Sequence, residues 1–171
     1  MIRLAYAFDL PAVRRVETSA ATVFAGTHMD FAVNDAPNAA ADLLAAIDRG
    51  LMWVAVDERE GANEVVGFLF GEACAEGLYL RELAVAAPHQ QRGHGAALMT
   101  TGIAAARRRG DRLVLLTTDR TLPWNAPFYT RLGFTVVEGD AIPAETKRRL
   151  ARQYAAGFDP AHRCAMVMGL A

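Results

Sequence analysis

Apolar positions recur along the chain with two different periods, and these periods predict short strands alternating with amphipathic helices. After Asp9, a suitable N-cap, Leu10, Val13, Val16 and Ala20 recur at helical spacing, so a helix is expected from there into the mid-twenties. Strands are expected where short apolar runs are bounded by turn residues, at 2–6, 51–56, 64–71, 78–85, 113–117, 134–138 and 164–170. Further helices are expected over 39–49, 96–109, 124–132 and 143–158.

Two kinds of connection between these elements predict the fold class. Short polar turns separate the runs at 51–56, 64–71 and 78–85, which predicts an antiparallel meander. The helix at 96–109 joins the strand before it to the strand at 113–117, and such a crossover implies a parallel pair. We therefore expect a mixed α/β (α+β) fold, with a central, mostly antiparallel sheet of about seven strands flanked by helices.

Composition and charge exclude several classes of protein. The chain has 171 residues without a repeat or linker, which predicts a single domain over 1–171. Eighteen Lys and Arg against 19 Asp and Glu offer no overall positive field, so neither nucleic acid nor a membrane is expected as a partner. No apolar run reaches the length of a membrane-spanning helix, and a cytoplasmic protein is expected. Cys74 and Cys164 lie far apart, which predicts buried reduced thiols and no zinc site.

The segment from Leu83 to Leu98 carries the clearest chemical signal. A strand ends there, and a loop with Gly93 and Gly95 leads directly into a helix. Such a turn gathers unpaired backbone N–H groups at the positive end of a helix, and Arg92 adds a charge. The pattern is not a P-loop, because no Lys-Ser/Thr follows, and it lacks the GxGxxG of a dinucleotide-binding turn. It predicts a site for an anion.

These residues resemble the GNAT N-acetyltransferase superfamily. Gln90, Gly93 and Gly95 match its (Gln/Arg)-x-x-Gly-x-(Gly/Ala) signature, the run 129–134 matches its Tyr-x-x-x-Gly-Phe ending, and the order of elements agrees from about residue 2 to residue 138. The resemblance implies acetyl-coenzyme A as co-substrate, with its pyrophosphate on backbone amides and its pantetheine paired like an extra strand. The cofactor-binding residues that it implies are Leu83, Ala84, Val85, Gln90, Gln91, Arg92, Gly93, His94, Gly95 and Ala96.

Acetyl transfer to an amine needs a base, donors for the thioester oxygen and an acid for the departing thiolate. Backbone N–H groups around Ala84 and Val85 are candidates for the donors, and the resemblance aligns Tyr129 with the family's general acid. Glu82 is the candidate base, because related enzymes often carry a carboxylate on this strand. Strand alternation leaves open which face meets the substrate, and a structural role for Glu82, paired with Arg81 or with a neighbouring strand, is the alternative.

The remaining candidates follow from position alone. Asn125 precedes Tyr129 by four residues rather than about seven, so its expected cofactor contact departs from the commoner family pattern. Trp53, Trp124 and Phe128 belong either to the core or to the acceptor pocket. His28, with Asp30, is a second candidate for the base or for the acceptor site. An additional helical segment at about 141–162 either caps the acceptor site or presents a solvated face.

The resulting hypothesis is an N-acetyltransferase in which a primary amine attacks acetyl-coenzyme A directly in a ternary complex, without a metal ion. Neither cysteine lies in the motif segments, which disfavours an acyl-cysteine intermediate. A small amine, an amino acid, an antibiotic or a protein amine all remain open as acceptor. Use of another acyl-coenzyme A and a non-catalytic, coenzyme A-binding regulator are the alternatives. A homodimer is compatible with an exposed sheet edge.

Overall fold

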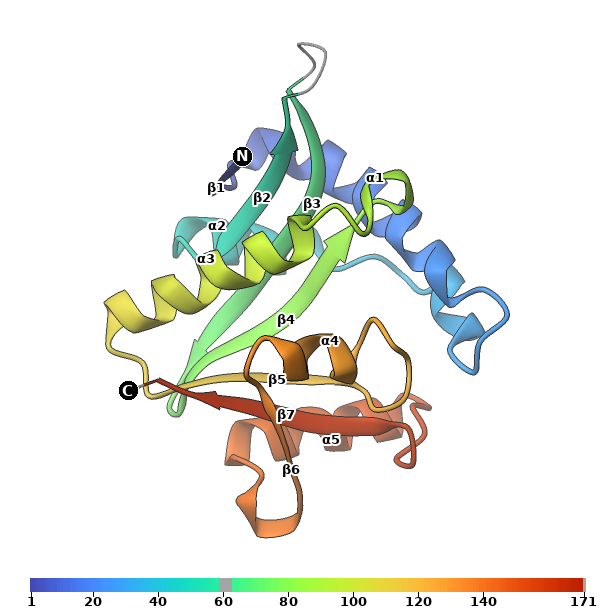
Figure 1. Ribbon diagram of the computed structural model, residues 1–171, viewed down its shortest axis with the longest axis vertical. Coiled ribbons are helices and arrows are strands. Elements are labelled where there is room, and N and C mark those ends of the chain that lie inside the picture. The colour runs from blue at the N-terminus through green and yellow to red at the C-terminus, as the bar shows by residue number, and fades with distance from the viewer. Residues whose placement is uncertain (59–62, 171) are drawn as a thin grey trace. The chain divides into compact units, whose positions relative to one another are not determined.

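The computed structural model describes residues 1–58 and 63–170, so the predicted turn at 57–63 lies partly outside the described residues. Over the described residues, seven strands form one sheet in the order β1-β2-β3-β4-β5-β7-β6, which confirms the mixed, mostly antiparallel sheet with helices (Figure 1). The elements are β1 (Ile2–Leu4), α1 (Leu10–Ala21), α2 (Ala40–Asp48), β2 (Met52–Asp57), β3 (Glu64–Cys74), β4 (Gly77–Val85), α3 (His94–Arg109), β5 (Leu113–Asp119), α4 (Ala126–Arg131), β6 (Thr135–Val137), α5 (Ala144–Ala155) and β7 (Arg163–Gly169).

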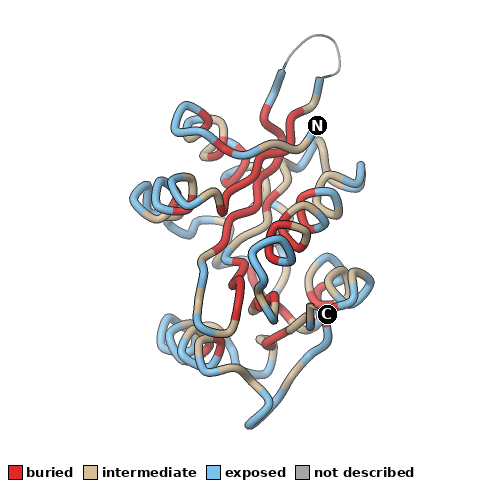
Figure 2. Tube along the Cα trace, turned by 90° about the vertical axis from the view of Figure 1, so that its left-hand side faces the viewer, coloured by how far each residue is buried: buried red, intermediate tan, exposed pale blue. Residues whose placement is uncertain are grey.

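The chain divides into two compact units. The first unit comprises Met1–Gly71 and Glu82–Gly102, and the second comprises Glu72–Arg81 and Ile103–Ala171. β3, β4 and α3 each contribute residues to both units. In both units buried residues follow the strands and one side of each helix (Figure 2).

The first unit packs helices on the two faces of its strands. β1 and β2 pair antiparallel, as do β2 and β3. Side chains of α1 and α2 form one core with alternate residues of β2, β3 and β4; this core contains Val13, Val16, Leu43, Ala46, Met52, Val54, Val56, Phe68, Phe70 and Ala84. The opposite face carries Gly67, which lies against Leu98 of α3. Every residue from Leu51 to Val56 is buried, as expected for a strand covered on both faces.

The second unit is built around β5 and β7. Seven residue pairs join these two strands antiparallel, and β6 adds three pairs on the other edge of β7. β4 pairs parallel with β5 through Gly77, Leu78 and Tyr79, which confirms the parallel pair inferred from the crossover. At the end of β5, Asp119 is fully buried, and its Oδ1 accepts hydrogen bonds from the backbone N–H groups of Thr121 and Leu122, both at 2.8 Å.

Several predicted boundaries differ from the observed ones for local reasons. Asp9 precedes α1 but makes no capping bond, because its carboxylate binds Arg3 and the Tyr6 amide instead. α3 begins at His94, earlier than predicted. Both cysteines are free; Cys164 is buried, whereas Cys74 is partly exposed, contrary to the prediction. Among the described helices, none is long and apolar enough to cross a membrane.

Candidate active site

In the first unit, the segment from Gln90 to Gly95 forms a tight turn at the start of α3. Gln91 and Gly93 both adopt positive φ, of 60° and 86°, which reverses the chain after β4. The Gly93 carbonyl accepts the hydrogen bond from the Ala97 N–H at 3.0 Å, so the helical ladder begins at Gly93. The N–H groups of the first helical turn have no acceptor within the helix, and they follow directly on this loop. The turn predicted to bind an anion therefore leads directly into the first turn of α3.

Side-chain contacts fix the start of this loop to the rest of the first unit. The Gln90 Nε2 donates to the Val85 carbonyl at 3.0 Å, and the Ser19 Oγ of α1 accepts from the Ala87 N–H at 3.0 Å. Gln91, Arg92 and Gly93 are exposed, whereas the other residues of the signature are half-buried. Gln90 thus has a structural reason for its place in the signature, because it closes the turn on the last residue of β4.

Gly67 of β3 allows a close approach behind the end of β4. A Cβ at this position would lie 3.0 Å from the Ala84 carbonyl oxygen, 3.2 Å from Val85 Cγ2 and 3.4 Å from Leu98 Cδ1. These distances are tighter than most packing contacts, so the backbone at 83–85 is supported from β3 without room for a side chain. Ala84 is buried, and Leu83 and Val85 are half-buried.

Glu82, the predicted base, belongs to a polar network with α1 and the segment before α2. The Asn38 Nδ2 donates both to Glu82 Oε2 and, at 2.6 Å, to Glu17 Oε1. Glu17, nine per cent exposed, also accepts from the Asn38 N–H at 2.9 Å and from Arg14 Nη1 at 2.7 Å. Glu82 therefore lies on the face of β4 that α1 covers, as Ala84 does. Its neighbour in this network is Asn38, and Arg81 donates through Nη1 to Glu72 Oε1 at 2.6 Å.

Sequence reasoning missed Glu17 and Asn38. Glu17 follows Val16 on the buried stripe of α1, and a carboxylate on such a stripe is the signal that could have been used. Asn38 had no comparable signal, because it lies in an irregular segment and meets Glu82 only through the tertiary fold.

In the second unit, the motif from Tyr129 to Phe134 ends α4 and enters β6. Gly133, at φ 98°, ends the helix in a conformation that favours glycine, and its N–H donates to the Thr130 carbonyl at 3.0 Å. Phe134, one per cent exposed, anchors the turn in the core, and its ring packs edge-on against Tyr129 at a centroid distance of 6.0 Å. Tyr129 is half-buried, and Phe128 packs on it at 5.2 Å.

The other candidate residues for cofactor or acceptor binding lie in different elements. Asn125 is the N-cap of α4, where its side chain makes no capping bond while its carbonyl accepts from the N–H groups of Phe128 and Tyr129. Trp124 is 40 per cent exposed, whereas Trp53 is three per cent exposed in β2, as expected for the core alternative. His28 is exposed in the segment before α2.

A second network of polar side chains joins β4, β5, β7 and α5 within the second unit. Sequence reasoning did not find it. The hydroxyls of Tyr79 and Thr117 are 2.7 Å apart, and Gln153 Nε2 donates to Thr117 Oγ1 at 2.9 Å. Arg163 donates through Nη2 to Gln153 Oε1 at 3.1 Å. Burial raises the pKa of Tyr79 and lowers the pKa of the Arg163 guanidinium. The helix of the additional segment 141–162 therefore contributes Gln153 to an internal hydrogen-bond network.

The acetyltransferase (GNAT) domain family matches residues 48–136, and the chain belongs to this family. The matched range includes the loop at 90–95 and the run from Tyr129 to Phe134.

Solved structures share the fold over nearly the whole chain. The PaiA N-acetyltransferase from Thermoplasma acidophilum, in complex with coenzyme A, has a TM-score of 0.71 at 16% identity, over 99% of this chain and 98% of that one. The ribosomal-protein-alanine N-acetyltransferase from Brucella melitensis has a TM-score of 0.69 at 20% identity, over 99% of both chains. Rv2747 from Mycobacterium tuberculosis, also in complex with coenzyme A, has a TM-score of 0.68 at 22% identity, over 100% of this chain and 99% of that one.

Proposed function

We propose that this chain is an N-acetyltransferase that transfers the acetyl group of acetyl-coenzyme A to a primary amine. The observation that carries the proposal is the loop from Gln90 to Gly95, whose two positive-φ residues lead into the first turn of α3 in a chain that belongs to the GNAT family. Backbone N–H groups in this arrangement suit the pyrophosphate of coenzyme A. Coenzyme A in the related structures of PaiA and Rv2747 supports the choice of cofactor.

The end of β4 is the proposed binding strand for the pantetheine arm. β4 extends to Val85, whereas among the described residues it pairs with β5 through Gly77–Tyr79. Backbone groups at 83–85 are offered as the partners of the pantetheine amides, and an N–H near Ala84 as the donor to the thioester oxygen. Asn125, which belongs to the second unit, is also proposed to contact the cofactor.

The proposed chemistry is a direct transfer in which the acceptor nitrogen loses two protons and the departing thiolate gains one. Glu82 accepts a proton from the ammonium group of the acceptor, directly or through water, and the amine nitrogen then bonds to the thioester carbonyl carbon. The carbon–sulfur bond breaks, and Tyr129 donates its proton to the departing thiolate. The nitrogen releases its second proton, which returns to the Tyr129 phenolate through water. A phenol, with an ordinary pKa of about 10, is a suitable donor to a thiolate whose conjugate acid has a pKa of about 8.5. The products are an N-acetylamine and coenzyme A.

The acceptor is proposed as a small-molecule or peptide amine. The related structures include an N-acetylglutamate synthase and ribosomal-protein-alanine N-acetyltransferases, so both kinds of acceptor occur on this fold. Trp124, Phe128 and His28 remain the proposed acceptor residues, whereas the buried Trp53 is assigned to the core; the exposed face of Trp124 is the one best suited to contact a ligand.

Calorimetric titration with acetyl-coenzyme A and free coenzyme A tests cofactor binding. In Gly93→Trp the indole enters open space, since no heavy atom lies within 4 Å of the added Cβ, and it covers the turn where the pyrophosphate is proposed to bind. Gly110→Trp is the matched control, because Gly110 also has positive φ and open space but lies after the other end of α3. We expect binding to the native chain and to Gly110→Trp but not to Gly93→Trp. Absence of binding by the native chain would overturn the proposal.

Thiol release during an amine screen tests the chemistry. Tyr129→Phe should lower kcat by roughly a hundredfold or more, with little change in the affinity for acetyl-coenzyme A, because it removes only the acid. Tyr154→Phe, which alters an exposed tyrosine of α5, should leave kcat unchanged. Equal kcat values for both variants would refute the role of Tyr129. Binding without turnover of any amine would instead favour a coenzyme A-binding regulator.

A further inference from the structure

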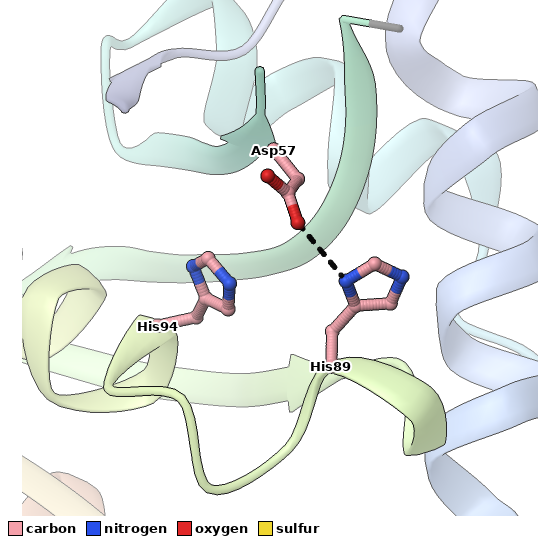
Figure 3. A group of neighbouring side chains, drawn as sticks. All are labelled: Asp57, His89 and His94. Carbon is pink, nitrogen blue, oxygen red and sulfur yellow. Dashed lines mark ion pairs between the residues drawn. The ribbon is translucent and has the colours of Figure 1, made fainter. Parts of the chain in front are cut away.

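Three metal-ligating side chains meet in the first unit, beside the loop at 90–95. They are Asp57 at the end of β2, His89 at the end of the 3₁₀ turn Ala87–His89, and His94, the first residue of α3. One ligand atom from each lies within 4.8 Å of the other two, and all three residues are half-buried. Figure 3 shows the three side chains converging, with the two imidazoles on either side of the carboxylate.

The imidazole of His89 has a buried nitrogen whose hydrogen-bonding capacity is unused. Its Nδ1 is fully enclosed and makes no hydrogen bond with the described residues, and it lies 3.5 Å from Asp57 Oδ2. That separation exceeds the usual length of a hydrogen bond between nitrogen and oxygen. A buried nitrogen without a hydrogen bond is unfavourable, and this one faces the Asp57 carboxylate, to which Figure 3 draws the ion pair, and a second imidazole.

We propose that Asp57, His89 and His94 bind one divalent transition-metal ion, for which Zn²⁺ is the appropriate probe. Two imidazole nitrogens and one carboxylate oxygen are a suitable donor set for zinc, and three protein ligands leave a fourth position for water. Donor atoms around a tetrahedral zinc ion, each about 2.0–2.2 Å from the metal, lie roughly 3.4 Å apart. Small side-chain rotations would bring the observed ligand atoms, which are within 4.8 Å of one another, to that separation.

The location of the three residues defines what the ion would do. His89 and His94 stand at the two ends of the segment 90–93, and Asp57 belongs to a different strand, so one ion would tie both ends of the loop to β2. The ion takes no part in acetyl transfer, which is complete without it. The ion would restrict the motion of the loop. If the proposed function is correct, it would thereby change the affinity of the loop for coenzyme A.

Zinc binding is tested on the full, tag-free chain, because a polyhistidine tag would bind the same ions. Competition against a chromophoric chelator should give one Zn²⁺ per chain, with an affinity that falls by roughly tenfold or more in Asp57→Asn, His89→Gln and His94→Gln. His28→Gln and His162→Gln are the matched controls, since with the two ligands they account for the four histidines of the chain, and both should bind as the native protein does.

A thermal-unfolding measurement keeps the test independent of enzyme activity. Zn²⁺ should raise the Tm of the native chain and of His28→Gln but not that of His89→Gln, while the metal-free variants show whether each substitution has left the fold intact. Absence of stoichiometric binding, or equal affinity in native protein and His89→Gln, would overturn the proposal. Loss of zinc binding in a control variant would place the zinc at another site and would also overturn the proposal.

A further experiment measures the affinity for coenzyme A with and without Zn²⁺. This experiment rests on the proposed function. Any change must appear as an equal change in zinc affinity when coenzyme A is present. A chain that binds zinc but no coenzyme A would refute the proposed function alone, whereas a chain that binds coenzyme A but no zinc would refute the metal site alone.

Discussion

Replacement of Gly77 by alanine should disrupt the parallel pairing of β4 with β5. Gly77 lies opposite Leu113 at the start of the three-residue register that joins the two strands. It has φ 149°, and an added Cβ would lie 2.0 Å from the Leu113 carbonyl oxygen, against about 3.5 Å for an ordinary contact. The atom in the way is backbone, so a side-chain rotation cannot relieve the clash.

The expected cost follows from these contacts. Moving the two strands apart by the missing distance would break about two backbone hydrogen bonds, at about 1 kcal/mol each. The positive φ adds strain of roughly 1–2 kcal/mol for an alanine. The free energy of unfolding should therefore fall by about 3–4 kcal/mol, which for a chain of this length lowers the Tm by roughly 10 °C.

The Gly110→Ala variant separates the energetic cost of the clash from the cost of the backbone conformation. Gly110 also has positive φ, of 78°, but no heavy atom lies within 4 Å of its added Cβ. This control should lose only the conformational part, about 1–2 kcal/mol. Urea unfolding followed by circular dichroism measures both variants against the native chain. If Gly77→Ala loses no more stability than Gly110→Ala, the inferred clash with Leu113 is wrong.

Two further predictions concern stability. Burial opposes ionisation of Asp9, but the Arg3 guanidinium, at 2.7 and 2.8 Å from its carboxylate oxygens, and the Tyr6 N–H outweigh it and hold the pKa of Asp9 below its usual range. A lowered folded-state pKa gives its full stabilisation above the unfolded value of about 3.9, and the stabilisation is lost as the pH falls from there toward the folded pKa. Asp9→Asn should therefore cost about 2 kcal/mol at pH 7 and progressively less below pH 4. An equal deficit at pH 7 and pH 3 in urea unfolding would contradict this. Thr146→Val should raise the free energy of unfolding by about 1 kcal/mol, because the buried Thr146 Oγ1 has no hydrogen-bond partner among the described residues; a lower Tm in calorimetry would show that the hydroxyl is satisfied.

The order of elements and the parallel β4–β5 pair were predictable, because the crossover at 96–109 allows few other topologies. The loop at 90–95 was predictable for a different reason, since Gly93 takes a backbone conformation, with φ 86°, that other residues adopt at a cost. The contacts of Glu82 with Asn38 were not predictable, because they depend on how an irregular segment returns to the sheet. The same holds for Asp57, whose meeting with His89 requires the positions of two separate elements.

The place of β7 between β5 and β6 also affects how the chain is made. A ribosome synthesises β5 and β6 before β7, yet both strands pair with β7 in the finished sheet. During synthesis, the edge of β5 that β7 will occupy is unpaired while apolar residues such as Val114 and Leu116 are already available for contact. The second unit therefore completes its sheet only after β7 has emerged from the ribosome. Between the emergence of β5 and that of β7, the growing chain is expected to be most prone to aggregation and most dependent on chaperones.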